Sequence, residues 1–270
     1  FTCPSPAFVT ISGTMTQVDA GAITGYQDWN SAADLRGQLT DAAQDFTAHV
    51  RRRVRYTSGV AAGAITWIGS LGGGPTIANV GRPRTGGLPD GILFGAFKLP
   101  AIGDSYVVET FDTDILEYQF QCPGAWITLK DVRVRNPTAG STVGKNTHCD
   151  SGLGAGSWQR LKLFGVLFST QDATSKSTCS GGQTWLACAI EGPNFQYYGG
   201  FCNTKGLCCF GALNVYAGAM FQNDSTMHDG NGTDSAHLLV DNFAAVFSQT
   251  FEAFFGNTNV VQTSLVRVNG

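Results

Sequence analysis

The chain has 270 residues, of which 43% are hydrophobic and 14% charged, and its formal net charge is -3. The hydrophobic content excludes an intrinsically disordered chain, and the slightly acidic balance argues against binding of nucleic acid through overall charge. No apolar segment reaches the roughly 20 residues that a membrane-spanning helix needs. Low charge together with 35 glycines is typical of an extracellular β-rich protein with many turns.

A first helix is predicted between about residues 31 and 53. Its apolar residues recur at helical spacing and would share one face: Leu35, Leu39, Ala42, Phe46 and Val50. The basic residues Arg51, Arg52, Arg53 and Arg55 would then lie at its C-terminal end, where cations are favoured. We interpret them as a solvated helix end, and a contact with a polyanion is the alternative.

The middle of the chain predicts strands, because short apolar runs alternate with Gly, Pro and Asn. The expected strands lie at 7–15, 60–70, 91–98, 105–111, 114–120, 125–135, 158–169, 184–191, 207–220 and 260–268. Within 125–135, the apolar residues change faces between Leu129 and Val132. A strand with a period of two residues needs an extra residue to do this, so a β-bulge is expected near Lys130 and Asp131.

A second helix, rich in Phe, is predicted at about 235–255. Its apolar residues follow the 3.6-residue period: Leu239, Phe243, Val246, Phe247, Phe251, Phe254 and Phe255. The order of elements predicts a β-dominated α+β fold, with an antiparallel sheet or sandwich core flanked by the two helices. We expect residues 1–270 to form a single domain.

Eight cysteines predict a fold stapled by disulfides in a secreted protein. They are Cys3, Cys122, Cys149, Cys179, Cys188, Cys202, Cys208 and Cys209. Their spacing does not match the Cys-x2-4-Cys pairs of zinc sites, and it leaves the pairing of the cysteines open. The first residue is Phe rather than Met, as expected after removal of a signal peptide. Two glycosylation sequons, at Asn223 and Asn231, support an extracellular location.

Motifs for nucleophilic catalysis and phosphate binding are absent from the sequence: it contains neither Gly-x-Ser-x-Gly nor Gly-x4-Gly-Lys-Ser/Thr. Acidic residues are the remaining candidates for catalysis, because paired carboxylates hydrolyse glycosidic bonds. The candidates are Glu109, Asp112, Asp114, Glu117 and Glu191. Whether the protein is an enzyme is left open by the sequence.

Two candidate binding sites lie in the second half of the chain. Asp229, Asn231 and Asp234 offer closely spaced oxygen ligands, which a calcium ion prefers, although their spacing departs from that of an EF-hand. The aromatic residues Phe195, Tyr197, Tyr198 and Phe201 could stack on sugar rings or contact a protein partner. Ordinary packing within a sheet and a hydrogen-bonded turn are the respective alternatives.

One segment resembles a known family. Asp104–Phe111 followed by Pro123–Arg135 is similar to the third and fourth strands of single-strand-binding OB-folds. The resemblance covers about 30 residues, and it implies a barrel that binds single-stranded nucleic acid. The acidic balance and the cysteines point away from that function.

The sequence therefore favours a secreted, extracellular protein without catalytic activity. Such a protein would bind a partner or a glycan, or would assemble with itself at a surface. A secreted carbohydrate-active enzyme that uses paired carboxylates is the alternative, and an OB-fold nucleic-acid binder is a more distant one. No cofactor other than the calcium ion is expected.

Overall fold

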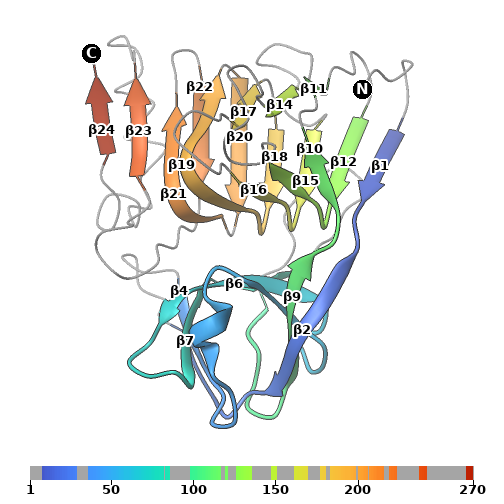
Figure 1. Cartoon of the computed structure of the whole chain (residues 1–270), viewed down its shortest axis with the longest axis vertical. Coiled ribbons are helices and arrows are strands. Elements are labelled where there is room, and N and C mark those ends of the chain that lie inside the picture. Colours follow the sequence, from blue (N-terminus) through green and yellow to red (C-terminus); the bar gives the residue numbers. More distant parts are fainter. Residues whose placement is uncertain are drawn as a thin grey trace.

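A computed structural model of the chain shows two connected parts, both built from strands (Figure 1). The structure describes residues 8–28, 36–81, 83–85, 98–116, 119–120, 126–135, 147–150, 161–169, 177–180, 183–198, 200–205, 207–215, 219–223, 237–241 and 266–269. One part is a stack of parallel strands formed by β1 and by the residues after 112. The other is an antiparallel sheet that lies between β1 and β10 in the sequence.

The parallel part winds as a three-sided solenoid in which successive coils stack in register. Its first face is a six-stranded parallel sheet. The strands of this face are β1 (Phe8–Ser12), β12 (Trp126–Lys130), β15 (Leu161–Phe164), β18 (Gln183–Leu186), β20 (Gly200–Lys205) and β22 (Ala219–Asn223). The chain continues from β12, β15, β18 and β20 into strands of the second face, whereas β1 leads into the antiparallel sheet.

The second and third faces share two long strands, β19 (Ala189–Tyr198) and β21 (Cys208–Val215), whose mutual register shifts between Gly192 and Phe195. Before the shift, β19 pairs with β16 (Leu167–Ser169), and the second face continues from β16 to β13 (Arg133–Arg135) and β10 (Asp114–Leu116). After the shift, β19 pairs with β17 (Ser177–Ser180), and β21 pairs with β23 (His237–Asp241). The third face continues from β17 to β14 (Thr147–Asp150) and β11 (Gln119–Phe120), and from β23 to β24 (Val266–Asn269).

The corner between the first and second faces repeats from coil to coil. Asp131, Gly165 and Ala187 follow partnered strand ends, and all three have a left-handed backbone, with φ of 55°, 60° and 48°. The next residue in each coil, such as Val132 or Val166, is buried inside the solenoid. Backbone hydrogen bonds continue through the corner, as from Gly165 N to Leu186 O at 3.0 Å. The corner therefore turns the chain without interrupting the stacking.

One aromatic ring from each face fills the middle of the solenoid. Trp185 of the first face, Phe168 of the second and Phe195 of the third are fully buried, with ring centroids 4.8 to 5.5 Å apart. The indole nitrogen of Trp185 donates to the side chain of Gln183 at 2.8 Å, so this buried polar pair is satisfied.

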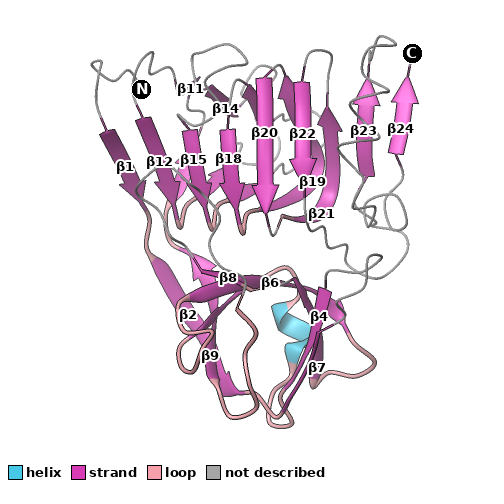
Figure 2. Ribbon diagram, turned by 180° about the vertical axis from the view of Figure 1, so that it is seen from behind, coloured by secondary structure: helices cyan, strands magenta, loops and turns pink. Residues whose placement is uncertain are grey.

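The antiparallel part is a curled sheet that we call the barrel. Its order is β2 (Met15–Ala22), β9 (Ser105–Phe111), β5 (Arg53–Tyr56), β6 (Ala64–Leu71), β7 (Ile77–Gly81), β4 (Arg36–Thr40) and β3 (Gly25–Asp28), with β8 (Arg84–Thr85) beside β6. The first and last strands of this order, β2 and β3, are consecutive in the chain, so the sheet returns on itself. A single 3-10 turn, η1 (Phe46–His49), places Phe46 in the barrel core (Figure 2).

The barrel docks on the corner of the solenoid through buried side chains of β5 and β6. Trp67 donates its indole N–H to the carbonyl of Ala187 at 2.9 Å, and its ring stacks on Phe111. Arg53 donates to the carboxylate of Asp131 and to the carbonyl of Gly165 at 3.4 Å. The barrel therefore contacts the left-handed corner residue of three successive coils.

The predicted β-rich fold is confirmed, and the antiparallel arrangement holds for the barrel. The predicted helix at 31–53 is wrong over 36–53, and residues 31–35 lie outside the described residues. Residues 36–40 are a strand that pairs with β3 and β7, and residues 53–56 are a strand between β9 and β6. Arg53 is 2% exposed rather than solvated, and its guanidinium is bound by Glu109 of the barrel and by Asp131 of the solenoid corner. The expected bulge near Lys130 and Asp131 is instead the solenoid corner.

The predicted helix at 235–255 is wrong over 237–241, where β23 pairs with β21 and β24, and residues 242–255 lie outside the described residues. The expected disulfide staples are not found among the cysteines described with their side chains, Cys179, Cys188 and Cys208. Cys188 is a buried thiol near backbone carbonyls of its own coil and the preceding one. Within the described part, no helix has the length and apolarity to cross a bilayer.

Candidate functional site

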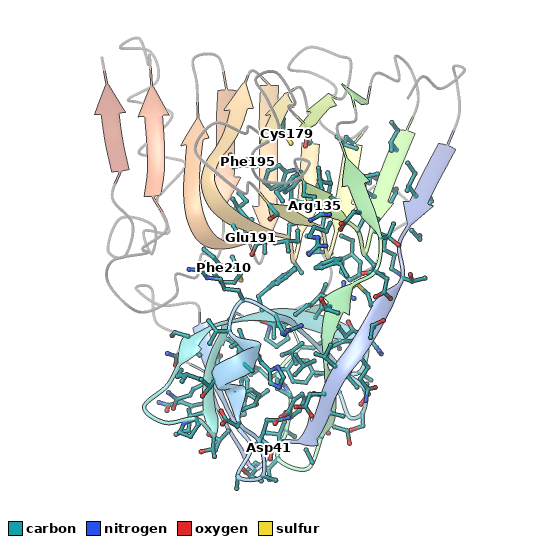
Figure 3. All side chains as sticks on the ribbon, in the orientation of Figure 1. Asp41, Arg135, Cys179, Glu191, Phe195 and Phe210 are labelled. Atoms are coloured by element: carbon teal, nitrogen blue, oxygen red, sulfur yellow. The ribbon has the colours of Figure 1, made fainter. Side chains whose placement is uncertain are left out.

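Polar side chains form a group on the outer surface of the second face, above the barrel. We call this group the outer polar row; it consists of Asp114, Arg133, Arg135, Ser169 and Glu191, contributed by β10, β13, β16 and β19. Strand alternation explains their position, because the residues between them, such as Val134 and Phe168, point inward and are buried. Figure 3 labels Arg135 and Glu191 on this face.

Asp114 is the centre of a charged cluster at one end of the row. Arg133 binds it with two parallel hydrogen bonds, at 2.7 and 3.0 Å, and the Nε of Arg135 lies 2.7 Å from the same carboxylate. The hydrogen bond that Arg133 donates to Asp114 raises the pKa of Arg133, against the effect of burial, and the charge of Glu191 adds to the increase. The three charged side chains are 21 to 29% exposed, so a ligand can reach them.

At the other end of the row, the hydroxyl of Ser169 donates to Glu191 at 2.6 Å. In the next coil, the partner of Glu191 is Phe210, which is buried with Trp67 in an apolar cluster between the two parts. The row thus runs from a partly exposed arginine–aspartate cluster to the apolar junction with the barrel. It presents guanidinium donors and carboxylate acceptors, and the buried hydroxyl of Ser169 orients Glu191.

This arrangement does not suit hydrolysis by paired carboxylates. Asp114 and Glu191 lie on strands β10 and β19, which β13 and β16 separate, so their backbones are about 14 Å apart across the sheet. Glycosidases need carboxyl groups about 5 to 9.5 Å apart. Both carboxylates are also bound to neighbouring side chains.

The other predicted acidic residues lie elsewhere. Glu109 is 3% exposed and accepts hydrogen bonds from Arg53 at 2.7 and 3.0 Å and from Arg55 at 2.6 Å, so it stabilises the barrel. Asp112 lies on the exposed connection between the barrel and β10. Glu117 lies outside the described residues.

The structure places one predicted aromatic binding residue, Phe195, in the solenoid interior, where it cannot stack on an external ligand. Tyr197 and Tyr198 belong to β19 and Phe201 to β20, and their side chains lie outside the described part.

The predicted calcium ligands Asp229, Asn231 and Asp234 lie outside the described residues. The sequon residue Asn223 is the last residue of β22, and Asn231 is again outside. Among the residues that are described, no group of three or more His, Cys, Asp or Glu side chains is placed to hold a metal ion.

The two strands of the OB-like segment are not neighbours. Strand β9 pairs with β2 and β5 in the barrel, whereas β12 pairs with β1 and β15 in the solenoid. The third and fourth strands of one barrel would be expected to lie in one sheet, so the similarity does not extend to the arrangement of the strands.

Comparisons of the chain with protein-family models, with curated proteins and with solved structures find no match.

Sequence reasoning identified Asp114 and Glu191 but missed Arg133, Arg135 and Ser169. The alternation of Arg133 and Arg135 around the apolar Val134 was the available signal, because it puts both cations on one face of a strand. Ser169 lies beside Glu191 only because their coils stack, and the sequence around either residue contains no pattern that indicates this contact.

Proposed function

We propose that the protein is a non-catalytic, extracellular glycan-binding protein whose outer polar row contacts the ligand. The observation that supports this proposal most strongly is the grouping of partly exposed arginine and carboxylate side chains on neighbouring coils. Sugar hydroxyls both donate and accept hydrogen bonds, and these side chains offer both functions in fixed orientations. Because each coil adds side chains along the stack, the row suits an extended chain better than a single sugar.

The engagement of the carboxylates supports binding rather than hydrolysis. Asp114 is held by two arginines, and Glu191 accepts a hydrogen bond from Ser169. These contacts fix the orientation of the polar groups before a ligand arrives, which reduces the entropy lost on binding.

An extracellular location is part of the proposal and rests on the sequence. Low charge, the many glycines and the two sequons support it. Fractionation of the native source should recover the chain outside the cell; recovery in the cytosol would contradict this part of the proposal.

The binding proposal is tested with an array of extended polysaccharides and with two variants of the row. Arg135→Ala and Ser169→Ala should each weaken binding of the retained glycan, Arg135→Ala by about tenfold or more because it removes a charged donor. Arg52→Ala is the matched control: its guanidinium donates to the backbone carbonyl of Ala48 in the barrel, away from the row.

Three results would contradict the proposal. If the intact protein retains no glycan, it is not a glycan-binding protein, and if a retained glycan releases new reducing ends, the protein is a hydrolase. Equal weakening by Arg52→Ala and Arg135→Ala would place the binding site elsewhere.

A further inference from the structure

Two loops of the barrel carry exposed aliphatic side chains. They lie at the ends of β5 and β9 opposite Arg53 and Phe111, which contact the solenoid. Val60 lies in the loop between β5 and β6 and is 71% exposed, and Ile102 lies in the loop before β9 and is 73% exposed. Leu99, in the second loop, is also exposed. We call residues 57–63 and 99–104 the barrel tip.

Hydrogen bonds hold the two loops of the barrel tip together. The amide of Thr57 donates to the carbonyl of Ser105 at 2.8 Å, and the amide of Ser105 donates to the hydroxyl of Ser58 at 2.7 Å. A Cβ on Gly59, next to Val60, would collide with the carboxylate of Asp104. The two loops are therefore neighbours, and the exposed aliphatic side chains belong to one pair of adjacent loops.

Further hydrogen bonds pair several backbone amides of the two loops. Gly63 N donates to Tyr56 O at 2.9 Å, and Gly103 N donates to Ile23 O at 2.8 Å. Ala101 N donates to the carboxylate of Asp104 at 2.9 Å. These bonds fix the loop conformation, and they reduce the cost of moving the loops into surroundings that offer few hydrogen bonds.

The barrel tip carries almost no charge. Residues 57–63 are Thr-Ser-Gly-Val-Ala-Ala-Gly, and residues 99–104 are Leu-Pro-Ala-Ile-Gly-Asp. The one ionisable group, Asp104, is buried. The two loops themselves therefore offer no exposed charge to a highly charged partner, and Asp45 is an exposed charge on the neighbouring segment.

We propose that the barrel tip inserts Val60, Ile102 and Leu99 into the interfacial region of a lipid bilayer with neutral headgroups. The tip projects from one end of the molecule and is small. The tip has 13 residues, 7 in one loop and 6 in the other, whereas each partner contributes roughly 20 to 30 residues to a stable protein interface, so a dimer through this tip alone is disfavoured. A bilayer accepts a projecting apolar group without a matching pocket, and insertion gains free energy from the buried apolar area.

The strength expected of this contact is modest. Burial of two or three aliphatic side chains supports binding at about millimolar accessible lipid for a single tip. Binding should be insensitive to salt, because screening weakens only charge interactions. Added phosphatidylserine should leave it unchanged for the same reason.

Flotation with phosphatidylcholine vesicles tests the proposal on the full chain. The intact protein should float with the vesicles. Val60→Asp/Ile102→Asp should bind at least tenfold more weakly, because each substitution puts a charge where an aliphatic side chain would enter the bilayer. Val18→Asp is the matched control, since Val18 is an exposed aliphatic residue on β2, outside the tip. Val60→Ser/Ile102→Ser should weaken binding in the same direction without adding charge, and circular dichroism checks that each variant is folded.

The proposal is overturned if the intact protein does not float, or if Val18→Asp weakens flotation as much as the tip variants. It is also overturned if sedimentation shows a dimer that the tip variants abolish, because the tip would then contact a second copy. The tip variants should leave glycan binding unchanged, so this test is independent of the outer polar row.

Discussion

Replacement of Arg53 by methionine should destabilise the protein strongly, because the carboxylate of Glu109 stays buried and loses one of its two arginine partners. Glu109 is 3% exposed, and its remaining cation, Arg55, is 42% exposed. Asp131 would lose its buried partner at the solenoid corner in the same variant. Removal of one member of a buried ion pair typically costs about 3 to 5 kcal/mol.

The double variant Arg53→Met/Glu109→Leu separates the ion pair from simple loss of packing. It removes both buried charges, so it should recover at least about 1.5 kcal/mol relative to the sum of the two single variants. Urea denaturation of the four proteins measures the free energies of unfolding. Arg52→Met is the control and should change stability by less than about 0.5 kcal/mol, since its side chain lies near the surface.

The reasoning is refuted if the free energy of unfolding of Arg53→Met lies within about 1 kcal/mol of that of the intact protein. It is also refuted if the double variant equals the sum of the single variants, because the two charges would then not interact. If Arg53→Met destabilises the solenoid but leaves the barrel as stable as in the intact protein, the contact with Asp131 alone contributes to stability.

Three further predictions concern the barrel and the solenoid interior. Gly21→Ala should lose about 1 to 3 kcal/mol in urea denaturation, because its Cβ would overlap the Asp41 carboxylate and the Tyr106 hydroxyl, whereas Gly74→Ala meets no atom within 4 Å and should be nearly neutral. Burial raises the pKa of Cys188 to about 12, so iodoacetamide at pH 8 should label this thiol only after unfolding, as peptide mass spectrometry can show; rapid native labelling would contradict its burial. Hydrogen bonds from Gln44 and then His49 lower the pKa of Asp19. The stability that Asp19 contributes is therefore present above the unfolded pKa near 3.9, and it is lost as the pH falls through the lower folded pKa. Asp19→Asn should therefore lose less stability than the intact protein on acidification, by a small amount because the carboxylate is partly exposed, and identical acid profiles would refute this assignment.

Local patterns predicted individual strands well, because a strand of alternating residues carries its own signal. Residues 105–111 were predicted as a strand and form β9 with the same bounds. The sequence also located the change of faces after Leu129, although that change is a corner rather than a bulge. Ile127, Leu129, Val132 and Val134 are all buried, because the chain turns at Asp131 and keeps its apolar side inward.

The helix at 31–53 was mispredicted because buried residues matched a helical period by chance. Leu39 is buried as part of β4 and Phe46 as part of a 3-10 turn, so two different elements supply one apolar pattern. Gly37 marked the difference, since a Cβ there would collide with the Tyr26 hydroxyl across the pair of strands. A local period cannot reveal such a contact.

The solenoid was missed because its repeat is irregular in the sequence. Leu129, Leu163, Trp185 and Thr204 occupy one stacked position, yet they follow one another after 34, 22 and 19 residues. The left-handed corner is occupied by Asp, Gly and Ala in turn, so it has no shared residue type. The outer polar row depends on this stacking, so the sequence predicted only two of its residues, Asp114 and Glu191, as candidates.

The rigid docking of the barrel on the solenoid corner is tested most directly at the indole N–H of Trp67, which donates to Ala187 of the solenoid. Hydrogen exchange followed by NMR can compare it with the indole of Trp185, which is buried inside the solenoid, and Trp67→Phe identifies the resonance. If the two parts form one unit, both protons should exchange only through global unfolding, with equal free energies of opening. Exchange of the Trp67 proton at a much lower opening free energy than that of Trp185 would show that the barrel separates from the solenoid by itself.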